Sequence, residues 1–187
     1  MTGVQTCALP IYFQPILDRL QVVPTRFDLQ KASIVLEGKS DYYVLRYAIM
    51  VTKRTDMPLF PGMGAGTFGA LAAMHVGWNL NFLFVLDGDK QGKTERDRYI
   101  SEFGIPSNRI VTIDQFIQNV RVIEDLLDGD ALVAIQRELG LSDLPTKGQI
   151  KRFCQERLAS GKFHDLSPQF ILNANAILDG LNAALAQ

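Results

Sequence analysis

The pattern of hydrophobic and polar positions divides the chain into two parts. In the first part, short apolar runs rich in β-branched residues alternate with amphipathic segments, as expected for buried strands separated by helices. Strands are expected at residues 32–36, 57–60, 81–86 and 109–113. Helices are expected at residues 41–53, from a Gly-rich turn to about residue 76, and at residues 94–103. Ser40 is a suitable N-cap for the first helix. This alternation predicts a parallel α/β sheet.

The second part of the chain has a different pattern. From about residue 122 onwards no segment has the alternation of a strand, and apolar residues recur at helical spacing. The expected helices cover residues 126–139, 147–159 and 169–186. We therefore predict an α/β domain with a Rossmann-like parallel sheet over residues 32–128, followed by a helical C-terminal region over residues 129–187.

The N-terminal residues do not fit either pattern. Residues 1–11, MTGVQTCALPI, lack helical and strand periodicity and resemble a translated sequencing adapter. The segment of residues 12–31 is short, contains two prolines and is interpreted as a connector. If the first residues are foreign, the chain is expected to be a fragment of a longer protein.

Composition and charge exclude several classes of protein. Apolar residues make up 47% of the chain and charged residues 21%, which are ordinary values for a globular protein with a core. With 19 basic and 20 acidic residues, the net charge is −1, so nucleic acid would have to be bound by local basic patches or bridging metal ions. No apolar stretch is long enough to cross a bilayer, so no membrane association is expected. The two cysteines form no disulfide framework, which favours a cytoplasmic location.

Carboxylates gather where the expected strands end. Glu37 follows the first strand, Asp87 and Asp89 follow the strand at 81–86, and Asp41 lies one helical turn after Glu37. Ligands of parallel sheets bind at the carboxyl ends of the strands, so these side chains are expected to converge. Close carboxylates repel each other, and a hard divalent cation removes that repulsion. The alternative is that each carboxylate is a solvated loop residue or a helix N-cap.

Two motifs carry a resemblance to a known family. Residues 34–41, IVLEGKSD, resemble the first motif of Toprim domains, an apolar strand followed by Glu-Gly and by Asp four residues after the Glu. Residues 82–89, FLFVLDGD, resemble the second motif, an apolar strand that ends in Asp-x-Asp. The amino-acid sequences of both motifs are most similar to those of the OLD (overcoming lysogenisation defect) family, and the resemblance spans about residues 32–128.

The resemblance implies a function and a set of site residues. OLD-like proteins are ATP-dependent nucleases, so it implies hydrolysis of phosphodiester bonds in DNA with Mg²⁺ or Mn²⁺, most simply two ions. It also implies an ATPase domain N-terminal to this chain, a role in phage defence, and an organisation compatible with a homodimer. The implied metal ligands are Glu37, Asp41, Asp87, Asp89 and Glu124, with Asp125 as the alternative to Glu124. The implied catalytic residues are Glu37, Asp87, Asp89 and Lys147, with Lys151 as the alternative to Lys147.

Two other functions remain open at this point. Residues 64–69, GAGTFG, match the GxGxxG pattern of dinucleotide-binding folds, and Asp87 lies about 20 residues further on, where such folds place a ribose-binding acid. A dinucleotide-binding oxidoreductase is therefore an alternative, although the strand before this motif is flanked by Pro58 and Pro61, which disfavour a buried strand. The other alternative is a non-catalytic module that binds metal and nucleic acid.

Overall fold

The centre of the protein is a four-stranded parallel sheet. In the computed structural model, residues 32–62, 65–77 and 80–187 are described, apart from the side chains of residues 65–68. The strands are β1 (Ser33–Leu36), β2 (Leu59–Phe60), β3 (Phe82–Leu86) and β4 (Ile110–Thr112). They pair in the order β2-β1-β3-β4, and every pair is parallel. The predicted α/β fold with a Rossmann-like parallel sheet is confirmed.

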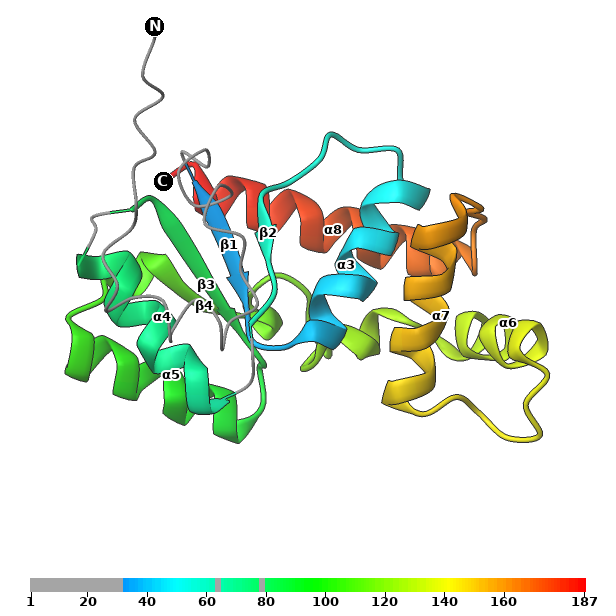
Figure 1. The fold of residues 1–187 in the computed structure, drawn as a ribbon, viewed down its shortest axis with the longest axis horizontal. Coiled ribbons are helices and arrows are strands. Elements are labelled where there is room, and N and C mark those ends of the chain that lie inside the picture. The colour runs from blue at the N-terminus through cyan, green and yellow to red at the C-terminus, as the bar shows by residue number, and fades with distance from the viewer. Residues whose placement is uncertain (1–31, 63–64, 78–79) are drawn as a thin grey trace, which may run out of the picture. The chain divides into compact units, whose positions relative to one another are not determined.

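Helices cover both faces of this sheet (Figure 1). The helices α4 (Ala65–Gly77) and α5 (Lys90–Phe103) contact each other and cover one face. There the ring of His75 lies edge-on against Phe82 and Phe84 of β3. The helices α3 (Lys39–Val51) and α8 (Pro168–Leu185) cover the other face. Because side chains of a strand point alternately to its two faces, the all-apolar β3 fills both layers.

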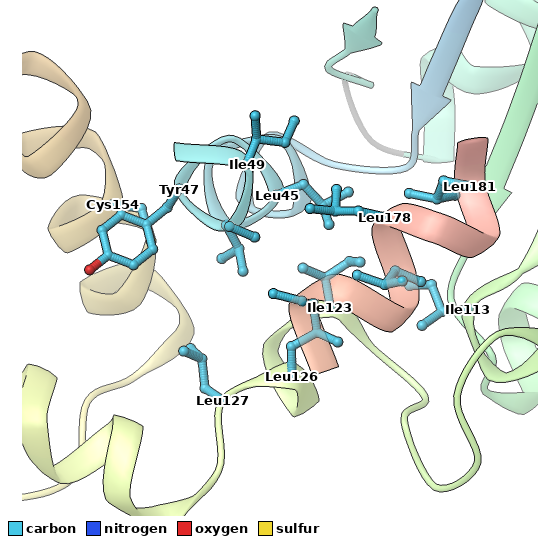
Figure 2. Packing of buried hydrophobic residues seen from close by; sticks show 14 of the residues in the cluster. Leu45, Tyr47, Ile49, Ile113, Ile123, Leu126, Leu127, Cys154, Leu178 and Leu181 are labelled. Atoms are coloured by element: carbon cyan, nitrogen blue, oxygen red, sulfur yellow. The ribbon is translucent and has the colours of Figure 1, made fainter. Parts of the chain in front are cut away.

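The C-terminal helices extend one of these layers. The helices α6 (Gly129–Leu139) and α7 (Lys147–Ser160) follow a short 3-10 helix, η4 (Ile123–Leu126), and α7 packs along α3. The ring of Tyr47 on α3 meets that of Phe153 on α7 edge-on, with centroids 5.6 Å apart. Figure 2 shows the same core continuing from Cys154 on α7 to Leu181 on α8. One hydrophobic core therefore joins the sheet to the predicted helical region.

Residues 32–187 accordingly form one compact unit. The change of pattern near residue 122 marks a change of secondary structure within a single core. The predictions for residues 1–11 and 12–31 lie outside the described residues. None of the helices in the described part of the chain combines the length and the apolar character needed to cross a membrane.

Two predicted helix starts were wrong. The helix α3 begins at Lys39 with Gly38 as its N-cap, so Ser40 lies in the first turn and is not the cap. The helix α5 begins at Lys90, four residues before the predicted start, because the side chain of Asp89 caps it by accepting a hydrogen bond from the Gly92 amide at 2.7 Å. Both helices therefore start immediately after a strand end, which brings their first turns to the same edge of the sheet.

Candidate functional site

The site is built on the two central strands. The chain goes from β1 through α3 outward to β2, and from β3 through α5 outward to β4, so the connections diverge between β1 and β3. Such a switch point leaves a crevice at the carboxyl ends of the two strands. Glu37 follows β1 and Asp87 follows β3 at this point. The two residues are in contact, because the Asp87 amide donates a hydrogen bond to Glu37 Oε2 at 3.2 Å.

The first turn of α3 adds a third carboxylate. Gly38, the N-cap, has no side chain to satisfy the amides of the first turn. Asp41, three residues later, turns back and accepts a hydrogen bond from the Gly38 amide through Oδ2 at 2.8 Å. This local contact fixes the Asp41 carboxylate, which is only 5% exposed, beside the crevice.

The fourth carboxylate comes from a segment distant in the sequence. Glu124 lies in η4, and its Oε1 accepts a hydrogen bond of 2.6 Å from Ser40 Oγ. Its neighbour Asp125 instead accepts hydrogen bonds from the amides of Arg121 and Val122 at 2.9 and 3.1 Å. The sequence analysis left Glu124 and Asp125 as alternative ligands. The structure places Glu124 at the site, whereas Asp125 accepts hydrogen bonds that begin η4. We call Glu37, Asp41, Asp87 and Glu124 the carboxylate cluster.

A lysine lies against this cluster. Lys147 is the first residue of α7, after the N-cap Thr146. Its Nζ lies 3.1 Å from Glu124 Oε2 and 3.9 Å from Asp41 Oδ1. Lys151, one turn further along α7, forms no ion pair with the cluster within the described part of the chain. The structure thus brings together the predicted residues Glu37, Asp41, Asp87, Glu124 and Lys147.

The electrostatics of the site follow from burial and repulsion. Burial raises the pKa of Asp87 to about 7, and the negative charges of Asp41 and Glu37 add to the rise. Burial likewise raises the pKa of Asp41 to about 6, with a further contribution from Glu124 and an opposing one from Lys147. Partial burial opposes the charged form of Lys147, but Glu124 and Asp41 outweigh it and raise the pKa of the ammonium. The cluster therefore has more negative charge than Lys147 offsets.

Two carboxylate oxygens of the cluster, Asp41 Oδ1 and Asp87 Oδ1, are buried and accept no hydrogen bond from the described residues, and a third buried oxygen, Glu124 Oε2, faces the Lys147 ammonium at 3.1 Å. Buried carboxylate oxygens without partners are costly, and oxygens of this kind are the ligands that Mg²⁺ and Mn²⁺ prefer. The donor chemistry therefore fits a hard divalent cation. The geometry is not that of a closed cage, because no three Asp, Glu, His or Cys side chains among the described residues are gathered around one point.

Asp89 is the predicted site residue that the structure separates from the cluster. Its carboxylate caps α5, so one of its oxygens is engaged by the Gly92 amide at 2.7 Å. It also lines a cavity of about 650 Å³ on the α5 side of the strand end, together with Lys90, Lys93 and Arg121. One alternative to metal binding was that a strand-end carboxylate acts as a helix N-cap. The structure shows this role for Asp89.

Two features of the site were missed by the sequence analysis. Ser40 was interpreted as a cap, yet it holds Glu124; the Gly38–Asp41 spacing, which resembles a capping box, would have placed the helix start correctly. Gly92 allows the first turn of α5 to lie directly on the strand end, since a Cβ there would be 2.0 Å from the backbone oxygen of Asp87. A glycine five residues after the strand-end Asp87 is the available signal for such close approach.

The glycine-rich motif lies next to the site. Gly64 and the side chains of residues 65–68 lie outside the described residues. The preceding strand, β2, has only two residues, Leu59 and Phe60. A Cβ on Gly62 would be 2.0 Å from the backbone oxygen of Leu36 and 2.3 Å from that of Glu37, so this glycine permits close contact between the β2–α4 turn and the end of β1.

A second cavity, of about 280 Å³, opens where α3 and α7 begin. We call it the lysine cleft. Its lining residues are Gly38, Lys39, Ser40, Asp41, Lys147, Gly148 and Lys151. Basic side chains therefore border the carboxylate cluster on this side, although the chain as a whole has a net charge of −1.

No protein-family model matches the chain, and neither a search of curated proteins nor a search of solved structures found a match. The interpretation of the site therefore rests on its geometry.

Proposed function

We propose that this protein is a divalent-metal-dependent nuclease that hydrolyses phosphodiester bonds in DNA. The observation that carries the proposal is the carboxylate cluster itself. Four carboxylates lie beside Lys147 at the carboxyl ends of β1 and β3, and two of them, Asp41 and Asp87, have a buried oxygen that lacks a hydrogen bond from the described residues. This combination suits an ion that is hard and positively charged, and a substrate that is anionic. The resemblance of residues 34–41 and 82–89 to Toprim motifs supports the same function.

In this proposal, Mg²⁺ or Mn²⁺ would be held by Asp41 Oδ1, Asp87 Oδ1 and Glu124 Oε2, the oxygens that the backbone amides and Ser40 leave available. Such ions, when bound, activate a water molecule and stabilise the leaving oxygen of a phosphodiester. Glu37 contributes by accepting the Asp87 amide, which fixes the end of β3 relative to β1. Ser40 and the Gly38 amide fix Glu124 and Asp41, so the ligands are oriented before the substrate arrives.

The lysines provide the contacts for the substrate. Lys39, Lys147 and Lys151 line the lysine cleft beside the cluster. Lys90, Lys93 and Arg121 line the larger cavity on the α5 side, although Lys93 is paired with Asp114 at 2.6 Å. An extended phosphate backbone can meet cations on both sides of the site, whereas a single phosphate cannot. This arrangement favours a polynucleotide over a mononucleotide.

The test is cleavage of supercoiled plasmid DNA by the full chain with Mg²⁺ or Mn²⁺, with gel separation of nicked and linear products. We expect metal-dependent nicking that EDTA stops. Asp87→Ala should reduce the rate on the order of 100-fold or more. The matched control is Asp143→Ala, which removes an exposed carboxylate from the loop between α6 and α7, outside both cavities, and should cleave normally.

Three results would contradict the proposal. Equal cleavage by the Asp87→Ala protein would show that the activity belongs to a contaminant or to another site. Metal-dependent binding of DNA without cleavage, measured by gel shift under the same conditions, would favour the non-catalytic module. Stabilisation by NAD together with indifference to metal would favour the dinucleotide-binding alternative.

A further inference from the structure

The oxygens of Asp41 and Glu124 are divided between two kinds of partner. One oxygen of each carboxylate is held by the protein: Asp41 Oδ2 accepts from the Gly38 amide at 2.8 Å, and Glu124 Oε1 accepts from Ser40 Oγ at 2.6 Å. The other oxygen of each, Asp41 Oδ1 and Glu124 Oε2, is buried and faces the Nζ of Lys147 at 3.9 and 3.1 Å. Asp41 Oδ1 and Glu124 Oε2 thus both face the Lys147 ammonium.

The lysine is the mobile member of this group. The side chains of Asp41 and Glu124 are 6% and 12% exposed, whereas that of Lys147 is 57% exposed. The backbone under Lys147 is fixed, because Ile150 and Phe153 of α7 are buried against α3 and its neighbours. The four-carbon stem can therefore move the ammonium into the adjacent lysine cleft without any change in the helix.

Charge and size show why one cation excludes the other. Lys147 contributes one positive charge to two carboxylates, and Glu37 and Asp87 add further negative charge nearby. Mg²⁺ binds carboxylate oxygens at about 2.0–2.1 Å. An ion at that distance from Glu124 Oε2 on the side facing Lys147 would crowd an ammonium that is 3.1 Å from the same oxygen. The two positive charges would also repel each other.

We propose that the Lys147 ammonium and a divalent cation compete for the free oxygens of Asp41 and Glu124, so that metal binding displaces Lys147 into the lysine cleft. Lys147 is then an internal substitute for the metal: it stabilises the metal-free protein and weakens metal binding. On displacement its charge moves to the side where Lys39 and Lys151 lie, and so becomes available to a phosphate. This inference rests on the proposed metal-binding function of the cluster.

The test is the metal affinity of Lys147→Met, measured by isothermal titration of the full chain with Mn²⁺ at about pH 8.5, where protons compete little for the carboxylates. We expect the dissociation constant to fall about tenfold, equivalent to about 1.4 kcal/mol, for an ion pair with two largely buried partners. The matched control is Lys162→Met. It removes the same charge from an exposed side chain beyond the end of α7, outside the lysine cleft, and should change the constant less than about twofold.

The outcomes separate this inference from the proposed function. Tighter binding by Lys147→Met than by Lys162→Met supports competition. Unchanged or weaker binding, in a wild type that binds Mn²⁺, overturns the competition and leaves the metal site intact. Absence of Mn²⁺ binding in the wild type and in both variants overturns the proposed function itself, and the inference with it.

A second measurement uses the wild type and does not depend on the variant's folding. Lysine acetylation, followed by mass spectrometry, reports how freely each ammonium is exposed. Lys147 should be modified several-fold faster with Mn²⁺ than with EDTA, because metal releases it from Asp41 and Glu124. Lys162, which is exposed and lies outside the lysine cleft, provides the internal control and should be modified at the same rate in both. Equal or slower modification of Lys147 in the presence of bound metal would contradict displacement.

Discussion

Replacing Asp87 with Asn should stabilise the metal-free protein at neutral and alkaline pH. Asp87 lies at the end of β3 against Glu37, and its Oδ1 is buried without a hydrogen bond from the described residues. Burial, together with the charges of Asp41 and Glu37, raises its pKa from 3.8 to about 7. The folded protein therefore binds this proton more tightly than the unfolded chain does. Ionisation of Asp87 accordingly costs folding free energy.

The magnitude follows from this difference in pKa. The change from 3.8 to about 7 corresponds to ~4 kcal/mol in the free energy of unfolding. Because the side chain is only partly buried, solvent screening reduces the expected cost to ~2 kcal/mol. A protein of this size should gain roughly 4–8 °C in thermal midpoint when that cost is removed. Asn is close to Asp in shape, so the substitution removes the charge without leaving a cavity.

The pH dependence distinguishes this mechanism from a general change in packing. Below about pH 4, Asp87 is protonated in both the folded and the unfolded wild type, so Asp87→Asn should have nearly the same stability as the wild type. As the pH rises towards 7, the unfolded wild type releases the proton while the folded protein still holds it, and wild-type stability falls. The advantage of the variant should therefore grow between about pH 4 and pH 7 and remain constant above about pH 8.

Urea unfolding in EDTA at a series of pH values measures this difference. Asp97→Asn is the control, because its side chain is 75% exposed on α5 and its neutralisation should change stability by less than about 0.5 kcal/mol. A variant that is less stable than the wild type at pH 8, or a difference that does not vary with pH, would refute the reasoning. In that case Asp87 would not be destabilised by burial and by its neighbours.

Two substitutions test how the site is supported. Gly92→Ala should lower the free energy of unfolding by about 2 kcal/mol or more, because the new Cβ would lie 2.0 Å from the Asp87 backbone oxygen. Gly148→Ala, whose Cβ would meet nothing nearer than 4.0 Å, should stay within about 1 kcal/mol of the wild type, and equal effects in the two variants would contradict the close approach at Gly92. Ser40→Ala should cost about 1–3 kcal/mol in urea unfolding, because Glu124 loses its 2.6 Å hydrogen bond. Ser101→Ala removes an exposed hydrogen bond to Arg98 and should have little effect, so a Ser40→Ala protein as stable as this control would show that Glu124 does not depend on Ser40.

The helices and strands of the described chain could be predicted because their signals are local. The all-apolar Phe82–Leu86 has the pattern of a strand buried on both faces, and that is where it lies in the sheet. The C-terminal helices could be predicted from helical spacing and from their caps, such as Ser167 before Pro168. The helix starts at Lys39 and Lys90 differ from the predicted starts at residues 41 and 94. Gly38 and Asp89 act as caps within three residues of a strand end, so the turn between strand and helix is shorter than predicted.

The sequence alone determined that Glu37 and Asp87 would be at the same edge of the sheet, since each follows a strand and all the strands are parallel. Only the tertiary structure decided the rest of the site. Glu124 and Asp125 are neighbours of the same charge, and which of them joins the cluster depends on the direction in which η4 meets Ser40, 84 residues earlier. Lys147 rather than Lys151 reaches Asp41 because α7 packs along α3 with its first residue at the crevice. Such choices depend on packing between segments far apart in the chain, which local patterns of hydrophobicity do not encode.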